Sequence, residues 1–150
     1  MLEIRELDAW YGDSHILQGV NLSVGAGQRV ALLGRNGAGK STLLKSVMNA
    51  GPRAKGVLRF DGRDLAPLPP HQRTRLGLSL VPEDRRIFTH LTVAENIAIA
   101  RYGASAQRPA VPVPDIIERF PMLAPLQQRY GGQLSGGRAG PPARGGGGGG

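Results

Sequence analysis

The sequence GRNGAGKS, at residues 34–41, fits the pattern G-x-x-x-x-G-K-[ST] and is the strongest structural signal in the chain. Its glycines let successive backbone N–H groups turn inward around phosphate oxygens, a conformation that side chains would obstruct. Lys40 brings a positive charge to the β- and γ-phosphates, and the hydroxyl of Ser41 can ligate magnesium. The stretch therefore predicts a loop that binds the phosphates of a nucleotide.

The segments on either side of the loop support this prediction. Residues 29–33, RVALL, are continuously apolar after the arginine, which is typical of a strand covered on both faces in a parallel sheet. The following segment predicts a helix with four apolar side chains on one face: Leu43, Leu44, Val47 and Met48. The positive end of that helix would point at the same phosphates. The order of strand, loop and helix makes a chance match by a glycine-rich turn the weaker interpretation.

Alternating apolar and polar residues predict a small antiparallel region beside this core. Residues 2–7 and 15–24 alternate in this way, and residues 56–65 predict a third strand that ends in an Asp-Gly turn. A short apolar run at residues 78–81 predicts a second buried strand. The chain is therefore expected to form an α/β fold.

Short helices are expected further along the chain. Residues 69–77 have proline near the start and glycine at the end. Residues 92–95, TVAE, form a capping box that begins a helix running to about Arg101. Residues 103–114 predict a flexible linker, and residues 115–120 open another short helix.

Length and composition exclude several classes of protein. The 150 residues and 40% apolar content suit one soluble domain, and the lack of cysteine excludes disulfides and thiolate metal sites. No apolar run approaches the roughly 20 residues that span a bilayer, so we expect a cytoplasmic chain. The net charge of +8 comes from scattered arginines that are not interleaved with aromatic residues. Specific nucleic-acid binding is thus disfavoured, although it stays open as an alternative.

Two further stretches narrow the class of phosphate-binding protein. Tyr11 lies in AWYGD upstream of the loop, and LSGG follows about a hundred residues downstream, at 134–137. Each is weak alone, since Tyr11 could be a plain strand-end aromatic and LSGG is a common turn composition. In this order with the loop, they resemble the ATP-binding-cassette (ABC) family. The resemblance implies a P-loop NTPase fold of the ABC type, with a parallel core sheet, helices and a small antiparallel β subdomain.

The resemblance also implies which residues contact nucleotide. Tyr11 would stack on adenine, and the LSGG signature would bind the γ-phosphate of an ATP held by a partner subunit. The residues assigned to ATP in this way are Tyr11, Gly34, Arg35, Asn36, Gly37, Ala38, Gly39, Lys40, Ser41, Thr42, Leu134, Ser135, Gly136 and Gly137.

Residues 80–97, LVPEDRRIFTHLTVAENI, match the segment that joins the nucleotide to the membrane subunit in this family. Glu83 stands where most members have glutamine, and its carboxylate could meet Mg²⁺ together with Ser41. A solvated turn is the alternative for Glu83. The apolar side chains of Phe88 and Leu91 would contact a coupling helix of the transporter.

The resemblance is closest to one branch of the family. Residues 68–77, LPPHQRTRLG, and 119–126, RFPMLAPL, are similar to the ATP-binding subunit of branched-chain amino acid importers, whose relatives serve urea and other amides. Such subunits form a head-to-tail dimer with a second ATP-binding subunit at the cytoplasmic face of the inner membrane. They work with membrane permease subunits and, indirectly, with a periplasmic solute-binding protein.

The resemblance extends over residues 1 to about 137 and then stops. An ABC ATPase needs an apolar strand ending in Asp-Glu (the Walker B motif) and a later histidine, and no such residues follow His90 and Glu95. We therefore expect an incomplete ABC domain at 1–137, with the C-terminal half of the fold missing and no catalytic residue. Residues 138–150 are rich in glycine and proline and are expected to be a disordered tail. A nucleotide-binding fragment that does not hydrolyse ATP is the alternative to an active ATPase subunit.

Overall fold

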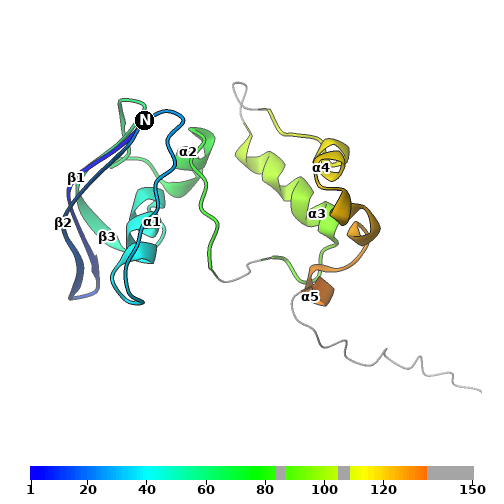
Figure 1. Ribbon diagram of the computed structural model, residues 1–150, viewed down its shortest axis with the longest axis horizontal. Helices are drawn as coiled ribbons and strands as arrows, with labels where there is room; N and C mark the ends of the chain where they lie inside the picture. The colour runs from blue at the N-terminus through cyan, green and yellow to red at the C-terminus, as the bar shows by residue number, and fades with distance from the viewer. Residues whose placement is uncertain (84–86, 105–108, 135–150) are drawn as a thin grey trace, which may run out of the picture. The chain divides into compact units, whose positions relative to one another are not determined.

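The computed structural model describes residues 1–83, 87–104 and 109–134. The chain forms two compact units, the first from Met1 to Val81 and the second beginning at Pro82 (Figure 1). The predictions for Ser135, Gly136 and Gly137, and for a disordered tail at 138–150, lie outside the described residues. Each unit is described by itself below.

The first unit contains an antiparallel sheet, as the alternating residues predicted. Its strands are β1 (Leu2–Tyr11), β2 (Ser14–Val24), β3 (Arg53–Phe60) and β4 (Arg63–Asp64), and their spatial order is β2-β1-β3-β4. Figure 1 labels the first three. The predicted Asp-Gly turn joins β3 to β4, and both of its residues have positive φ, 48° at Asp61 and 77° at Gly62. Positive φ at both central positions is what a tight hairpin turn of this kind requires.

The central strand β1 contains a bulge that its neighbour accommodates. The pairing of β1 with β3 shifts register between Arg5 and Asp8, and Glu6 in this gap has φ 46°. Opposite it, Gly56 has φ 135°, and a Cβ at that position would lie 2.4 Å from the carbonyl oxygen of Glu6. Glycine at residue 56 is therefore required both by its own φ and by the close approach of the β1 backbone.

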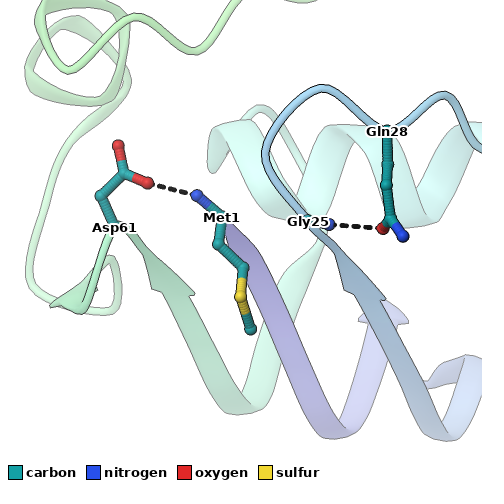
Figure 2. Close-up of polar contacts among 4 residues, drawn as sticks. All are labelled: Met1, Gly25, Gln28 and Asp61. Atoms are coloured by element: carbon teal, nitrogen blue, oxygen red, sulfur yellow. Dashed lines mark hydrogen bonds and ion pairs between the residues drawn. The ribbon is translucent and has the colours of Figure 1, made fainter.

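Two polar contacts lie at one end of this sheet, where β1 begins and β2 and β3 end (Figure 2). The backbone N–H of Gly25 donates to Oε1 of Gln28 at 2.6 Å, and the N–H of Gln28 donates back to the Gly25 carbonyl at 3.2 Å. This turn ends β2 and starts the segment that leads to the glycine loop. At the same end of the sheet, the N-terminal ammonium of Met1 pairs with the carboxylate of Asp61, which lies in the turn between β3 and β4.

The core of the first unit lies between the sheet and helix α1 (Lys40–Met48). Helix α2 (Pro70–Arg75) confirms the short helix predicted within residues 69–77. On α1 the buried apolar side chains are Leu43, Val47 and Met48, whereas Leu44 is 46% exposed, contrary to the predicted apolar face. Thr42 and Ser46 are buried in its place, because the position of the sheet, and not the apolar pattern alone, selects the inner face. The main cluster consists of Ile4, Leu7, Ala9, Leu17, Leu43, Val47, Leu58 and Leu65.

The prediction of two parallel strands at residues 29–33 and 78–81 was wrong for this structure. Neither segment forms a strand, and both carry strongly exposed apolar side chains, Leu33 at 91% and Val81 at 89%. A strand exists only where its backbone groups pair with a neighbour. Within the described residues, the sheet consists of the four antiparallel strands, and neither segment pairs with any of them. The apolar residues of both segments favour a strand, but a strand also needs a neighbour with which its backbone groups can pair.

The second unit is helical in its described part. It contains α3 (Val93–Ala98), the 3₁₀ helix η1 (Ile99–Gly103), α4 (Val113–Arg119), the 3₁₀ helix η2 (Pro121–Leu126) and α5 (Gly131–Leu134). The predicted capping box is confirmed at the start of α3. Glu95 N–H donates to Oγ1 of Thr92 at 3.2 Å, and Thr92 N–H donates to Oε2 of Glu95 at 2.7 Å. Helix α4 begins at Val113, inside the predicted linker, because Pro112 and Pro114 suit a helix start.

Backbone contacts tie the start of α3 to the segment before α5. The N–H of Val93 donates to the carbonyl of Arg129 at 2.9 Å, and the N–H of Gly131 donates to the carbonyl of Leu91 at 2.8 Å. Gly131 is buried, and a Cβ there would lie 2.7 Å from the carbonyl oxygen of Phe88. Within the described residues of the chain, no helix is long and apolar enough to cross a bilayer.

Candidate nucleotide-binding site

The predicted phosphate loop ends at the first turn of α1. Gly37 and Gly39 have φ of 84° and 95°, which glycine adopts without the steric cost that other residues pay. Between them, the N–H of Ala38 donates to the carbonyl of Arg35 at 3.1 Å and closes a turn. Residues 34–38 are exposed to solvent. Gly37 and Gly39 therefore have the left-handed backbone conformation that favours glycine at these positions of the pattern.

Lys40 folds back over the loop that precedes it. Its ammonium donates to the carbonyl of Gly34 at 2.6 Å and to the carbonyl of Arg35 at 2.9 Å. An ammonium has three donors, and two of them are directed at these carbonyls. The Lys40 side chain thus connects the end of the loop to its first two residues. It also places a positive charge at the N-terminus of α1.

Gly39 fastens the loop to the core of the first unit. It is buried, and its carbonyl accepts the first hydrogen bond of α1 from Leu43 N–H at 2.9 Å. A Cβ on Gly39 would lie 2.7 Å from Cδ2 of Leu17 and 3.5 Å from Cγ2 of Ile16, both on β2. The glycine is therefore required here by packing as well as by φ, because the loop runs directly against β2.

The first turn of α1 is suited to an anionic ligand. Its N-cap, Gly39, has no side chain that could accept from a helix N–H group, and the first turn contains no acidic residue. The first N–H groups of a helix lack acceptors within the helix, and together with the helix dipole they favour negative charge. Ser41 is half-buried in this turn, and Thr42 is buried with its carbonyl accepting from Oγ of Ser46 at 2.8 Å. The loop and this turn together can surround phosphate oxygens with donors.

Tyr11 ends β1 in the same unit as the loop, and its side chain is 42% exposed. Its ring lies beside Gly51, where a Cβ would be 3.7 Å from Cε1 of Tyr11. The neighbouring Trp10 has different contacts. Its ring stacks on His15 with 4.6 Å between ring centroids, and the guanidinium carbon of Arg53 lies 4.9 Å from the centroid of the Trp10 ring. An exposed face on Tyr11 is compatible with adenine stacking, which stays a prediction.

The remaining predicted site residues belong to the second unit. Glu83 is exposed just after Pro82, and Leu134 ends α5 and is 38% exposed. Their roles toward Mg²⁺ and toward a partner's phosphate stay predictions, since the loop and Ser41 lie in the first unit. Within residues 1–83, 87–104 and 109–134, no group of three or more His, Cys, Asp or Glu side chains could hold a metal ion. Mg²⁺ prefers oxygen ligands, such as carboxylates and the phosphates of a nucleotide.

The glycine loop, Lys40 and the helix that starts there are the parts of a P-loop NTPase, and comparison with known proteins defines the family. The sequence profile of the ABC transporter family matches residues 17–140. This chain belongs to the ABC transporter family.

Among curated relatives, the chain is similar to proteins of amino acid transport. It is 36% identical over 137 residues to the probable branched-chain amino acid transport ATP-binding protein LivF of Archaeoglobus fulgidus, covering 91% of this chain and 58% of that protein. It is 36% identical over 137 residues to the high-affinity branched-chain amino acid transport ATP-binding protein BraG of Pseudomonas aeruginosa, covering 91% and 59%. The lipopolysaccharide export system ATP-binding protein LptB of Escherichia coli is 33% identical over 139 residues, covering 91% and 57%.

The fold is similar to a solved ATP-binding protein of the same family. A putative ABC transporter ATP-binding protein from Pyrococcus furiosus superposes with a TM-score of 0.68 at 25% identity, covering 89% of this chain and 62% of that one. The ABC-type fold expected from the sequence is thus confirmed. The chain spans somewhat more than half the length of the curated relatives named above.

Proposed function

We propose that residues 34–42 bind the triphosphate of ATP, and that the chain serves as ATP-binding subunit of an importer, for branched-chain amino acids. The observation that carries this proposal is the loop itself. Gly37 and Gly39 have the positive φ that turns N–H groups inward, and the ammonium of Lys40 brackets the loop at the N-terminus of α1. These donors favour a polyanion over a neutral ligand.

Each predicted residue has a distinct role in this proposal. The main chain of residues 34–42 donates to phosphate oxygens, and Lys40 neutralises the charge of the β- and γ-phosphates. Ser41 and Glu83 hold Mg²⁺, which neutralises further phosphate charge when bound, and Tyr11 stacks on adenine. Residues 134–137 contact the γ-phosphate of the nucleotide held by a second ATP-binding subunit in a head-to-tail dimer.

The partners follow from the same proposal. The chain works at the cytoplasmic face of the inner membrane with permease subunits. The side chain of Phe88, which is 51% exposed, makes an apolar contact with a permease subunit. A periplasmic solute-binding protein delivers the substrate without touching this subunit. We expect no specific nucleic-acid partner, and a steep salt dependence of DNA binding with preference for one sequence would contradict this.

The transported solute is proposed from the relatives. LivF and BraG are named for branched-chain amino acid transport, and both are 36% identical to this chain. LptB, named for lipopolysaccharide export, is 33% identical, and uptake of urea, other amides or other amino acids is a further alternative. In the source organism, Lys40→Ala in the chromosomal gene should abolish uptake of labelled leucine. Unchanged leucine uptake with loss of urea uptake or of lipopolysaccharide export would select the corresponding alternative.

Nucleotide binding is tested by calorimetry with ATP and Mg²⁺. Lys40→Ala removes one charged donor to phosphate, worth about 1.5–3 kcal/mol, and should weaken binding roughly 10- to 150-fold. Lys45→Ala is the matched control, because it removes the same charge from the last turn of the same helix. Equal affinities of the two variants for ATP would refute the proposed role of the loop.

Hydrolysis is tested separately by phosphate release. We propose that a polypeptide of these 150 residues holds ATP without turnover, because no apolar strand ending in Asp-Glu follows Glu95 in them. Steady phosphate release that disappears in Lys40→Ala would contradict this part while supporting nucleotide binding.

A further inference from the structure

Arg73 is the one arginine of the described residues that is buried, with only 3% of its surface exposed. It lies on α2, and its guanidinium donates to four backbone carbonyls. Nε donates to Leu68 at 2.9 Å and Nη2 to Leu65 at 2.6 Å, which anchors the segment before α2. Nη1 donates to the carbonyls of Ser46 and Val47 at 3.0 and 2.7 Å. These last two carbonyls belong to the final turn of α1.

A buried cation is retained only where its surroundings compensate its charge. Burial lowers the pKa of the Arg73 guanidinium from its ordinary value, and the negative charge of Asp64 opposes that shift. The main compensation in contact is the set of carbonyl oxygens, two of them at the negative end of the α1 dipole. The last carbonyls of a helix have no partner within the helix. The Ser46 carbonyl also accepts from Asn49 N–H at 3.1 Å, so Arg73 adds a second donor there and supplies one to the Val47 carbonyl.

The other end of α1 is the candidate nucleotide site. The carbonyls of Ser46 and Val47 lie six to seven residues from Lys40 along α1, so about 10 Å of helix separates them from the first turn. The loop before that turn is exposed and held to the core at Gly39. A tilt or rotation of α1 would move the N–H groups and Lys40 relative to that anchor. The guanidinium, with four bonds in fixed directions, resists such movement better than apolar packing alone.

We propose that Arg73 is a positioning residue for nucleotide binding. By donating hydrogen bonds to the last carbonyls of α1, it fixes the position of the N-terminal turn of that helix, and of Lys40, relative to the phosphates. This inference rests on the proposed binding of ATP at residues 34–42. It adds a residue that contacts no nucleotide and acts through the helix. The planar fork is essential, because a lysine ammonium has the charge but cannot reach carbonyls on two sides.

The experiment compares Arg73→Lys, Arg73→Met and, as matched control, Arg75→Met in the full chain. Arg75 lies two residues away on α2 and is exposed. ATP affinity is measured by calorimetry at a temperature where circular dichroism shows each variant folded. Amide hydrogen exchange is measured by NMR without nucleotide at β1 and at Leu43, whose N–H makes the first hydrogen bond of α1. A general loss of stability would raise exchange at both places, whereas loss of positioning raises it at Leu43 first.

We expect Arg73→Lys and Arg73→Met to weaken ATP binding on the order of tenfold, the factor that one lost hydrogen bond to a charged group represents. Exchange at Leu43 should rise in both variants while β1 stays protected, and Arg75→Met should change neither. ATP affinity within twofold of the unsubstituted chain, or unchanged exchange at Leu43, overturns the inference. If Arg73→Met does not fold, Arg73→Lys decides alone. If the unsubstituted chain binds no ATP, the proposed function fails, and the exchange comparison alone decides whether Arg73 orders that turn.

Discussion

Replacing Gly39 by alanine tests whether the phosphate loop is built against β2, as the structure shows. Two costs add at this position. A residue with a side chain at φ 95° pays roughly 1–2 kcal/mol for a left-handed backbone. The new Cβ also meets Cδ2 of Leu17 at 2.7 Å, and Leu17 is packed in the core at 5% exposure, so overpacking adds about 1–3 kcal/mol. The sum is about 2–5 kcal/mol, a large part of the 5–15 kcal/mol that stabilises a typical domain.

Gly37→Ala is the matched control for this substitution. Gly37 has φ 84°, but nothing lies within 4 Å of its added Cβ, so only the backbone cost of roughly 1–2 kcal/mol applies. Urea unfolding followed by circular dichroism gives both free energies of unfolding. Gly39→Ala should be the less stable by about 1–3 kcal/mol. Equal stability of the two variants would show that the loop does not press on Leu17, and the packing account of Gly39 would be refuted.

Two further predictions concern the sheet and helix α3. Gly56→Ala should destabilise the first unit by several kcal/mol on urea unfolding, because its Cβ would meet the Glu6 carbonyl oxygen at 2.4 Å; Gly62→Ala, with open space around its Cβ, should cost only about 1–2 kcal/mol. Hydrogen bonds from Thr92 lower the pKa of Glu95, so its stabilising contribution is complete above its ordinary pKa and is lost as pH falls through the lowered value. In Glu95→Gln, the melting temperature followed by circular dichroism should therefore fall less steeply as pH is lowered than in the unsubstituted chain. The same pH dependence in both would contradict this.

Features that depend on neighbours along the chain could be predicted from the sequence. The loop at 34–41, the Asp-Gly turn at 61–62 and the capping box at Thr92 each involve residues within a few positions of one another. Their geometry follows from backbone sterics and from short-range hydrogen bonds, which the residue types themselves specify. The hairpin of β1 and β2 belongs with them, because a short turn brings adjacent alternating segments together.

Features that depend on distant partners could not be predicted in this way. Residues 29–33 have the composition of a buried strand, yet pairing requires a neighbour that local composition does not reveal. Leu44 lies on an apolar stripe but faces solvent, since the sheet contacts the side of α1 that contains Ser46. The buried Arg73 had no sequence signal, because the carbonyls that accept from it come from residues 5 to 27 positions away.

The sequence by itself determined the family, the phosphate loop and the local turns, because glycine, lysine and capping residues act on their immediate surroundings. Only the tertiary structure decided that Gly39 must lack a side chain against Leu17, and that Arg73 holds the far end of α1. Both depend on close approach between elements distant in sequence, and such approach is a consequence of how the whole unit packs.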